Sequence, residues 1–384
     1  MNLFSNSKIL GIIGGGQLGK MLLNDTFKWN IKTYVLDPDK DAPAKQFCNK
    51  FFCGDLNDFD TIYQFAKKVD VITFEIEHIN TEALIKLEEE GVIIYPKPNT
   101  LNIIQDKFKQ KKFYLDNNIP TSDFIFFDRK KDIYHALETK KIKLPFVWKS
   151  TKFGYDGFGV KIINNKADIE SIENKPCIIE ELIDYKKELS IIICRNLDGD
   201  YKLFPTVEME FNKISNQLET VIFPAEINDK INSEVREVAL KVADSFKNVG
   251  LLAIEMFLTI DNQILVNEVA PRPHNSGHFT IEGTMTSQFE QHIRAILNLP
   301  LGSTKLICAG LMMNLSGSEN FSGNVHYENL DKIFKFEGVN LHVYGKKKIR
   351  PNRKMGHITI LNKNKSKAEE IKNKIKKTIK IISK

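Results

Sequence analysis

The stretch Leu251–His278, LLAIEMFLTIDNQILVNEVAPRPHNSGH, contains two strand-like runs joined by a short turn signal. Asp261 and Asn262 are suited to the two loop residues of a β-hairpin, and such a loop would set the register of both strands. Glu255 and Glu268 each lie six positions from this loop, so we expect them to face each other across the ladder. Two like charges placed in this way repel, and a divalent cation between them would remove the repulsion.

Asn267 adds a neutral oxygen beside the two glutamates, and oxygen ligands suit magnesium that is shared with substrate phosphates. The sequence therefore predicts a magnesium–nucleotide site with Glu255 and Glu268 as metal ligands. The alternative is that one glutamate points to solvent beside a lysine. The segment after the hairpin favours the site, because Pro271 and Pro273 stiffen a run that packs cationic and hydrogen-bonding groups together: Arg272, His274, Asn275, Ser276 and His278.

The composition is that of a globular chain with two or three domains. At 384 residues and 42% hydrophobic content, the chain can bury a large core. It has no run of about 18 uncharged apolar residues, so we expect no membrane partner, and its first residues do not have the pattern of an export signal. The five cysteines are an odd number and widely scattered, which is typical of reduced thiols in a cytosol.

The formal net charge of +6 is concentrated at the carboxyl end. Residues 362–384 carry nine lysines and two glutamates, whereas the rest of the chain carries 46 basic and 47 acidic residues. Isoleucines in this tail recur at helical spacing, which predicts a terminal helix with one apolar stripe docked on its domain: Ile371, Ile375, Ile379 and Ile382. Because no aromatic residues interleave the lysines, we expect no nucleic-acid partner.

Residues 8–37 have the pattern strand, glycine turn, helix, strand. The turn contains the spacing GxGxxG, and Asp37 follows Gly16 by 21 residues, as in a dinucleotide-binding fold. Such a turn has open backbone amides at a helix N-terminus, which suit a phosphate or a carboxylate. The next strand, 71–74, is followed by Glu75 and Glu77, and carboxylates at the carboxyl end of a parallel strand line the ligand crevice of an α/β sheet. Helix capping or a surface position would also explain these acids.

Lysines and glycines in the middle of the chain indicate phosphate binding. The run 144–150 has the pattern of a buried strand that carries Lys149. GYDGFG (154–159) follows, and its three glycines would let a hairpin tip fold over phosphates with backbone amides as donors. An ordinary hairpin turn would also explain these glycines, but the lysine on the preceding strand favours a phosphate lid. Residues 102–114 form a basic helical segment that contains Lys107, and the sequence alone does not choose which of its lysines turns into a cleft.

Two further segments are candidates for nucleotide contacts. The strand-like run 176–183 leads through Glu180 and Glu181 toward Glu188. Adenine commonly pairs with exposed backbone at such a junction, and a carboxylate such as Glu188 would take the ribose hydroxyls. The later loop 344–353, YGKKKIRPNR, would close over a phosphate, although a solvated basic loop is equally consistent with its composition.

Taken together, GGGQLG (14–19), GYDGFG (154–159) and above all NEVAPRPHNSGH (267–278) resemble the N(5)-carboxyaminoimidazole ribonucleotide synthases, ATP-grasp enzymes of purine biosynthesis. The resemblance runs essentially end to end, including SQFEQHIRAILNLPLG (287–302) and YGKKKIRPNRKMGH (344–357). It implies an ATP-grasp architecture of the α/β and α+β classes. The implied domains are a Rossmann-like parallel-sheet domain over 1–103, a two-lobed ATP-grasp domain over 104–300 with a lid lobe at about 120–195, and a small β-rich domain over 301–384.

Such enzymes carboxylate 5-aminoimidazole ribonucleotide with bicarbonate and convert ATP to ADP and phosphate. The resemblance therefore implies ATP and Mg2+ as cofactors, a carboxyphosphate intermediate, these small molecules as partners, a cytoplasmic location and a homodimer. The implied ATP contacts are Lys107, Lys149, Gly154, Tyr155, Asp156, Gly157, Phe158, Gly159, Val160, Glu180, Glu181, Leu182, Ile183, Glu188, Phe211, Asn267 and Glu268. The implied substrate contacts are Gln17, Leu18, Glu75, Arg272, His274, Asn275, Ser276, Lys346 and Arg353. The implied catalytic groups are Tyr155, Arg272, His274 and Asp156, the last as base for the substrate amine, and the implied metal ligands are Glu255 and Glu268.

Two positions depart from the family pattern. Phe158 stands where GYDG is usually followed by arginine or lysine, so bicarbonate would be held by a neighbour such as Lys152. Phe211 stands where some members have a histidine near the nucleotide. Neither change touches the glutamate pair or the substrate loop.

Three other functions are compatible with parts of the sequence. An NAD-dependent oxidoreductase would explain GxGxxG and Asp37, but it leaves the opposed glutamates and the glycine lid unexplained. A nucleic-acid-binding protein would use the lysine tail. Another ATP-grasp ligase or carboxylase, acting on a different small phosphorylated substrate, is the nearest alternative.

Overall fold

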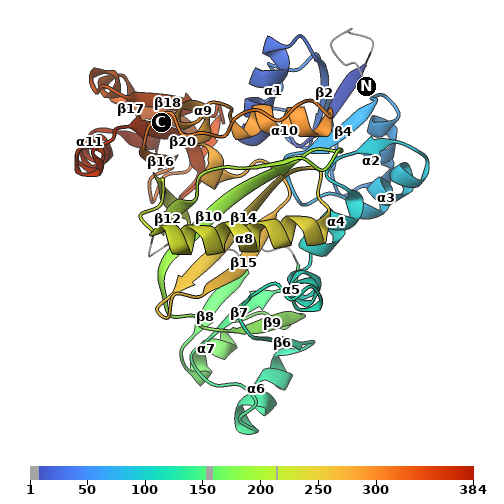
Figure 1. Ribbon diagram of the computed structural model, residues 1–384, viewed down its shortest axis with the longest axis vertical. Helices are drawn as coiled ribbons and strands as arrows, with labels where there is room; N and C mark the ends of the chain where they lie inside the picture. The colour runs from blue at the N-terminus through green and yellow to red at the C-terminus, as the bar shows by residue number, and fades with distance from the viewer. Residues whose placement is uncertain (1–7, 153–158, 213–214) are drawn as a thin grey trace.

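The computed structural model describes residues 8–152, 159–212 and 215–384. A parallel sheet with its helices comes first along the chain, a small antiparallel sheet second, and a large antiparallel sheet third (Figure 1). This combination confirms the predicted α/β and α+β fold class. Within the described part of the chain, no helix has the length and apolar character that crossing a membrane requires.

The N-terminal sheet has five parallel strands in the order β3-β2-β1-β4-β5. Leu10 and Ile12 of its central strand face a cluster with α1 and α10 (Gln288–Ile296), whereas Ile13 faces α2 and α3 on the other side. Burial on both faces explains why these strands are continuous apolar runs. The bounds are β1 (Ile9–Ile13), β2 (Lys32–Asp37), β3 (Lys50–Cys53), β4 (Val71–Phe74), β5 (Ile93–Ile94), α1 (Gln17–Lys28), α2 (Phe59–Ala66), α3 (Thr81–Glu89) and α4 (Pro98–Ile104).

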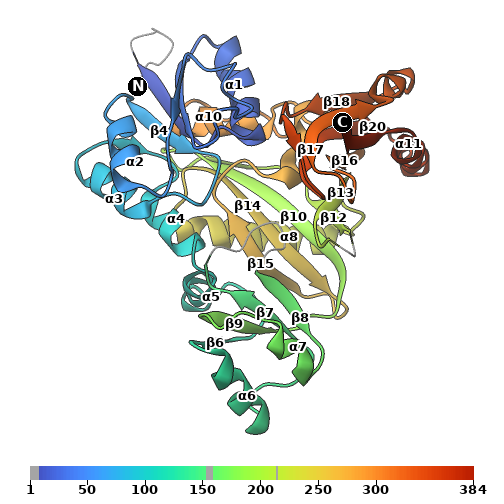
Figure 2. The ribbon, with the colours of Figure 1, turned by 180° about the vertical axis from the view of Figure 1, so that it is seen from behind.

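The predicted lid lobe contains a four-stranded antiparallel sheet in the order β6-β9-β7-β8. Its core joins Phe146 and Trp148 of β7 to Ile133 of α6 and Ile169 of α7. This sheet lies at the lower end of the molecule in Figures 1 and 2. The bounds are β6 (Phe124–Phe127), β7 (Phe146–Ser150), β8 (Val160–Ile163), β9 (Cys177–Glu181), α6 (Lys130–Glu138) and α7 (Lys166–Glu170).

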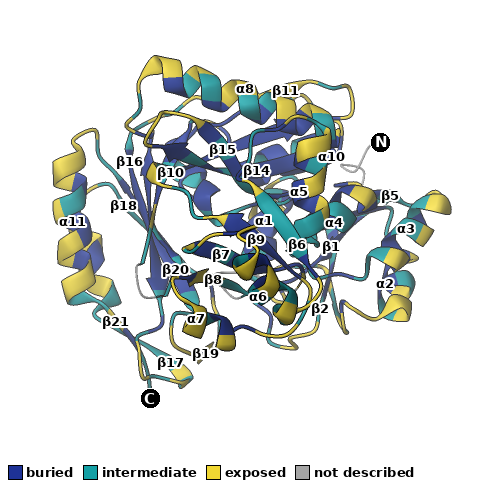
Figure 3. Ribbon diagram, turned by 90° about the horizontal axis from the view of Figure 1, so that it is seen from below, coloured by how far each residue is buried: buried dark blue, intermediate teal, exposed yellow. Residues whose placement is uncertain are grey.

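The large sheet follows the order β15-β14-β10-β12-β13-β16-β20-β18, with β11 added beside β10. Alternate residues of β10 face opposite helices: Ile191 and Ile193 pack with α8, whereas Ile192 and Cys194 pack with α10. Figure 3 shows the outer side of α8 exposed and the sheet beneath it buried. The bounds are β10 (Tyr185–Arg195), β11 (Tyr201–Leu203), β12 (Val207–Phe211), β13 (Leu218–Phe223), β14 (Gly250–Thr259), β15 (Ile264–Ala270), β16 (Gly310–Ser316), β18 (Val339–Val343), β20 (Lys354–Leu361), α8 (Asp229–Phe246), α9 (Thr280–Gly283) and α10 (Gln288–Ile296).

The large sheet runs across the predicted boundary at residue 300. Strand β13 before that boundary pairs with β16 after it, from Thr220 opposite Met313 to Phe223 opposite Gly310. The central and C-terminal parts therefore share one hydrogen-bonded sheet. The three domain boundaries stay a prediction.

The basic helical segment expected over 102–114 is divided between two helices. Helix α4 ends at Ile104, and α5 (Lys107–Asp116) begins after Asp106. The Asp106 carboxylate accepts hydrogen bonds from the backbone N–H groups of Phe108 and Lys109, at 3.0 and 3.2 Å, and so caps the new helix. This break sets the phase of α5 and points Lys107 toward the hairpin.

The β14–β15 hairpin confirms that Glu255 pairs with Glu268, but the expected two-residue loop was wrong. The backbone N–H of Thr259 donates to the carbonyl of Gln263 (3.0 Å), which leaves a loop of residues 260–262 between them. Asn262 in this loop has φ +64°, a left-handed conformation that asparagine tolerates better than most residues.

A β-bulge restores the predicted pairing. With the three-residue loop alone, Glu255 would face Asn267. The ladder shifts by one residue, because Met256 pairs with Val266 and Glu255 pairs with Glu268, so Asn267 is the extra residue on β15. The additional loop residue and the bulge shift the strand register in opposite directions, so Glu255 and Glu268 still face each other.

The lysine-rich tail is a helix followed by a strand. Helix α11 (Lys365–Thr378) buries Ile371 and Ile375, which confirms the docked helix, and then the chain becomes extended at Ile379. Ile379 is the extended residue that ends the helix and Ile382 lies on β21 (Lys380–Ser383), so the predicted places of both on the helical stripe were wrong. Strand β21 leaves the helix because β17 offers it an antiparallel partner. The remaining bounds are β17 (Gly323–Glu328), β19 (Lys348–Ile349), β21 (Lys380–Ser383) and the 3-10 turns Asn275–Gly277 and Leu330–Lys335.

Replacing Ile375 with alanine should lower the free energy of unfolding by about 2–4 kcal/mol, as for other fully buried aliphatic side chains. Ile375 is fully buried in a cluster with Met313 and Ile358 of the large sheet. Urea unfolding followed by circular dichroism measures the change. Lys377→Ala, on the exposed side of the same helix, is the control and should leave the midpoint nearly unchanged. Equal effects of the two substitutions would contradict docking through the apolar stripe.

Candidate active site

A cleft of about 610 Å³ lies where the carboxyl end of the N-terminal sheet meets the β14–β15 hairpin and the segment after it. The structure brings together here predicted contact residues that lie far apart in the sequence. They are Gln17, Leu18, Glu75, Lys107, Val160, Phe211, Glu255, Glu268, Arg272, His274 and Asn275.

The two opposed carboxylates differ in their electrostatic surroundings. The ammonium of Lys107 lies 2.6 Å from Glu268 Oε2 and holds the pKa of Glu268 well below its usual range. Burial, together with the charge of Glu268, raises the pKa of Glu255. The Glu268 side chain is 43% exposed and that of Glu255 only 14%, which agrees with Glu268 losing its proton at a lower pH than Glu255. A second full negative charge is therefore unfavourable here until a cation arrives.

Lys149 connects the bulge to the lid sheet. Its ammonium donates to Asn267 Oδ1 (2.9 Å) and to Glu180 Oε2 (3.1 Å). Glu180 also pairs with Lys111 (3.2 Å) and accepts a hydrogen bond from the Ser122 hydroxyl (2.9 Å). The Glu180 side chain thus holds two buried lysines in place, and an adenine contact by this segment stays a prediction.

The glycine turn binds the chain's own carboxylates, so the expectation of open amides was wrong. The backbone N–H of Gly15 donates to Asp37 Oδ2 (2.6 Å), and that of Gly16 donates to Glu75 Oε1 (2.7 Å). Glu75 fills the space beside Gly14, where a Cβ would lie 2.7 Å from its Cγ. The groups that these helix-terminal amides bind are therefore carboxyls of the chain itself.

Glu75 makes stability depend on pH, because burial raises its pKa to about 7 from the ordinary 4.5. A raised pKa stabilises the protonated form, so this contribution to stability is fully present below pH 4.5 and is lost as the pH rises through 7. Between these limits the free energy of unfolding of the wild type should fall by about 3 kcal/mol, since a difference of one pKa unit is worth about 1.4 kcal/mol. That of Glu75→Gln should not fall in this way.

Urea unfolding of both proteins at pH 5 and at pH 7.5 measures this difference. Glu89→Gln, at an exposed position of α3, is the control and should follow the wild type at both pH values. Parallel pH profiles for the wild type and Glu75→Gln would contradict the buried, protonated carboxyl.

The segment after β15 is held from both sides of the cleft. Arg272 forms an ion pair with Glu77 of the N-terminal part (2.9 Å). The His274 ring lies with Nδ1 2.8 Å from the Ser276 hydroxyl and Nε2 3.5 Å from Glu255 Oε1. Among the described residues, neither the side-chain nitrogen nor the oxygen of Asn275 has a hydrogen-bond partner, although both atoms are buried. Such atoms are suited to a ligand in the cleft.

Other predicted residues are not among the described residues that line the cleft. The Tyr185 hydroxyl donates to Glu188 Oε1 (2.7 Å), and burial raises the pKa of Glu188. Ser276 is fully buried and its hydroxyl contacts that of Ser190 (2.8 Å). The remaining positions are Gly159 before β8, Glu181 at the exposed end of β9, and Leu182 and Ile183 between β9 and β10. Gly154, Tyr155, Asp156, Gly157 and Phe158 lie outside the described residues.

The start of strand β20 contributes a lysine, Lys354, that the sequence prediction missed. Lys354 lines the cleft, whereas the predicted Lys346 and Arg353 are not among its described lining residues. The Lys346 ammonium donates to the Lys354 carbonyl (2.8 Å), and the Arg353 guanidinium donates to the Lys348 carbonyl (2.6 Å). Lys354 was inside the quoted segment 344–357, but only the fold shows which of its cations faces the cleft.

Lys111 was also missed, although it had a signal. Lys111 follows Lys107 by four residues and so shares its helix face. Glu77 follows the same strand as Glu75, where the sequence predicts a ligand crevice, and the structure confirms that it lines the cleft.

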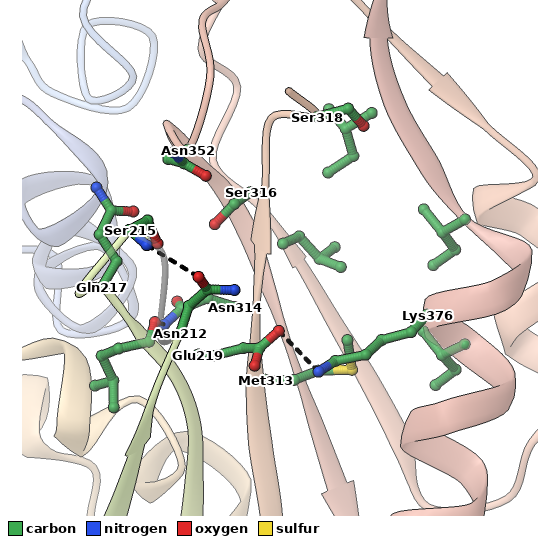
Figure 4. A pocket seen from close by; sticks show the side chains of 15 residues that line it. Asn212, Ser215, Gln217, Glu219, Met313, Asn314, Ser316, Ser318, Asn352 and Lys376 are labelled. Carbon is green, nitrogen blue, oxygen red and sulfur yellow. Dashed lines mark hydrogen bonds and ion pairs between the residues drawn. The ribbon is translucent and has the colours of Figure 1, made fainter. Parts of the chain in front are cut away.

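A second cavity, of about 320 Å³, lies between β13, β16 and α11 (Figure 4). Its described lining is mostly aliphatic and uncharged polar, with an ion pair between Lys376 and Glu219 (2.8 Å). These two charges neutralise each other, and the opposed glutamates are not among the residues that line it. We therefore assign nucleotide chemistry to the larger cleft.

Three family models match successive parts of the chain. Residues 7–105 match the ribonucleotide synthetase preATP-grasp domain, and residues 112–289 match the ATP-grasp domain. Residues 310–371 match the phosphoribosylaminoimidazole carboxylase C-terminal domain.

Relatives and solved structures resemble the chain over nearly its whole length. The N5-carboxyaminoimidazole ribonucleotide synthase of Bacillus subtilis is 38% identical, over 92% of this chain and 91% of that protein. The crystal structure of N5-carboxyaminoimidazole ribonucleotide synthetase from Thermotoga maritima is 42% identical, with a TM-score of 0.89 over 98% of this chain and all of that one. The Aspergillus clavatus N5-carboxyaminoimidazole synthase, solved with ADP and 5-aminoimidazole ribonucleotide, is 32% identical, with a TM-score of 0.88 over 97% and 98% of the two chains. With this similarity and the opposed glutamates in its cleft, the chain belongs to the N5-carboxyaminoimidazole ribonucleotide synthase family of ATP-grasp ligases.

Proposed function

We propose that this chain carboxylates 5-aminoimidazole ribonucleotide to N5-carboxyaminoimidazole ribonucleotide, with bicarbonate as the carbon source and ATP converted to ADP and phosphate. The observation that carries the proposal is the pairing of Glu255 with Glu268 beside Lys107, in the same cleft as Arg272 and His274. The first group suits a metal–nucleotide complex, and the second suits an anionic, hydrogen-bonding substrate.

The residues present fit Mg2+. Glu255 and Glu268 supply carboxylate oxygens, and burial, together with the charge of Glu268, raises the pKa of Glu255. Among the described residues, no group of three or more His, Cys, Asp or Glu side chains is placed to hold a metal. A metal at this pair would complete its coordination with water and phosphate oxygens, which is the usual state of Mg2+ in nucleotide sites. When bound, it would neutralise charge on the phosphoryl group.

Lys107 and Lys149 are the proposed phosphate contacts. Both ammonium groups are held by carboxylate or amide oxygens from β9 or β15, so their positions are set before a nucleotide binds. Such preorganised cations stabilise charge on a transferring phosphoryl group without reorganisation at the moment of reaction.

The ribonucleotide is proposed to lie at the other end of the cleft, against Arg272, His274 and Asn275. The orphaned Asn275 amide supports this, because both of its polar atoms need a partner. Ser276 is proposed to act through His274, whose ring it contacts. Lys346 and Arg353 are kept as proposed contacts for the substrate, with Lys354 added as the cation that faces the cleft.

The proposed reaction has three steps. A bicarbonate oxygen attacks the γ-phosphorus of ATP, which forms carboxyphosphate and releases ADP. Carboxyphosphate then breaks into carbon dioxide and phosphate. The substrate amine attacks the carbon of carbon dioxide and gives its proton to a base, for which Asp156 stays the proposed candidate. The protein's contribution is mainly positioning and charge neutralisation.

Phosphate release measured with ATP, Mg2+ and bicarbonate, in the presence and absence of 5-aminoimidazole ribonucleotide, tests the proposal. We expect the ribonucleotide to stimulate release and a carboxylated product to form. Release that is unchanged by the ribonucleotide, together with stimulation by another small phosphorylated compound, would favour a different ATP-grasp ligase.

The dinucleotide alternative is disfavoured by the glycine turn. Asp37, the residue expected to bind a ribose, instead accepts hydrogen bonds from the backbone N–H groups of Gly15 (2.6 Å) and Asp39 (2.8 Å). The cytoplasmic location and the homodimer are kept as proposals. The five free thiols support the former, since disulfides form mainly in oxidising compartments.

A further inference from the structure

The side chain of Gln288 binds the backbone of His274 at two points. Its Oε1 accepts a hydrogen bond from the His274 N–H (2.9 Å), and its Nε2 donates to the His274 carbonyl (2.7 Å). Gln288 is fully buried, so water does not compete for either bond. An amide that pairs with both backbone groups of one residue fixes that residue as a β-ladder would.

Gln288 is itself mounted on a fixed element. It is the first residue of α10, whose preceding Ser287 side chain caps the helix by accepting from the Glu290 N–H (3.0 Å). The Gln288 N–H donates to the Thr280 hydroxyl (2.8 Å), which donates in turn to the Gly277 carbonyl (2.6 Å). Helix α10 also packs in the core beneath the N-terminal sheet. This pair of hydrogen bonds from Gln288, which we call the clamp, therefore fixes the position of His274 relative to the rigid interior of the protein.

The His274 ring depends on this backbone position. It reaches toward Glu255 Oε1 (3.5 Å) and contacts the Ser276 hydroxyl (2.8 Å), at the centre of the cleft. We propose that Gln288 is a positioning residue that sets the His274 ring, and with it the substrate end of the cleft, without touching substrate itself. The inference rests on the proposed function, because it assigns His274 to the ribonucleotide.

The same helix contains a matched control. Gln291 is also fully buried, and its amide makes the same two-point bond, to Gly302: Nε2 donates to the carbonyl (2.9 Å) and Oε1 accepts from the N–H (2.8 Å). Gln291 and Gly302 are not among the described residues that line the cleft. Loss of either clamp removes equivalent hydrogen bonds, but only one of them holds a cleft residue.

Gln288→Met and Gln291→Met, which keep side-chain length but remove the amide, should be compared in the full-length chain. We expect similar drops in thermal midpoint for both. Only Gln288→Met should raise the KM for 5-aminoimidazole ribonucleotide, by at least about tenfold, with the KM for ATP within about twofold of wild type. A purely structural role would lower the yield or the thermal midpoint without this split between the two KM values.

A ribonucleotide KM for Gln288→Met within about twofold of wild type, or an equal rise for Gln291→Met, would overturn the inference. If Gln288→Met does not fold, Gln288→Asn takes its place under the same criteria, since it keeps the amide but is one methylene too short. Failure of both to fold while Gln291→Met folds would also overturn it. A wild-type enzyme that does not respond to the ribonucleotide would count against the proposed function, a result that is distinct from an unaffected Gln288 variant.

Discussion

Glu268→Gln is expected to lower kcat for ATP-dependent carboxylation by about 100- to 1000-fold, the size of effect that follows loss of one preorganised electrostatic group. The substitution keeps the shape of the side chain but removes a charge from the proposed metal pair. It also removes the ion-pair partner of Lys107, whose ammonium lies 2.6 Å from the Glu268 carboxylate. Lys107 would then lose the contact that holds it at the phosphate end of the cleft.

The fold should survive Glu268→Gln, because the Glu268 side chain is 43% exposed and its hairpin is held by backbone pairing with β10. Steady-state phosphate release at several Mg2+ concentrations, with circular dichroism of the same samples, makes the measurement. Part of the lost rate should return as Mg2+ is raised, since one ligand remains in Glu255. Asp261→Asn, at the exposed tip of the same hairpin, changes charge equally and should be fully active. Full activity of Glu268→Gln would refute the metal role.

Glu180→Gln is expected to cost about 3–5 kcal/mol of unfolding free energy, as when one partner of a buried ion pair is removed. Glu180 is 3% exposed, and its Oε2 lies 3.1 Å from the Lys149 ammonium and 3.2 Å from that of Lys111. The substitution leaves these two cations buried without a counter-charge. Burial already lowers the pKa of Lys111 to about 8 with Glu180 in place.

The pH dependence of Glu180→Gln gives an independent check. Although burial opposes ionisation, Lys149 and Lys111 lower the pKa of Glu180 to about 2 from the ordinary 4.5. A lowered pKa contributes stability above pH 4.5 that is lost as the pH falls toward 2, so the gap between wild type and variant should narrow in acid. Urea unfolding at pH 7 and pH 3.5 measures it. Glu181→Gln, exposed at the end of the same strand, should leave stability almost unchanged. A Glu180→Gln loss no larger than that of Glu181→Gln would show that the network is not a net source of stability.

Local chemistry in the sequence predicted the strands and the acidic pair of the site. Apolar runs and turn residues placed β14 and β15, and the pairing of Glu255 with Glu268 was correct. The loop length was wrong, and the bulge was not predicted, because neither Asn267 nor its neighbours has a signal for one. The bulge is stabilised by a long-range contact, the 2.9 Å bond from Lys149 to the Asn267 side chain.

Other errors share a cause, which is competition between groups distant in sequence. The backbone N–H groups of the glycine turn suit any anion, but they already donate to the carboxyl groups of Asp37 and Glu75. Ile382 continues a helical spacing, yet β17 offers it a strand partner. Lys346 and Lys354 look alike in a basic segment of the sequence, and only the fold shows that Lys354, at the start of β20, lines the cleft.

The sequence by itself determined the fold class, the family resemblance and the residue types that meet in the cleft, because periodicity, turn chemistry and motif spacing are local properties. Only the tertiary structure decided which of these groups are already bonded to the protein and which are free for a ligand. Hydrogen bonds and ion pairs such as Gly16 to Glu75, or His274 to Gln288, form between segments brought together by burial of the core, and their strength depends on that burial.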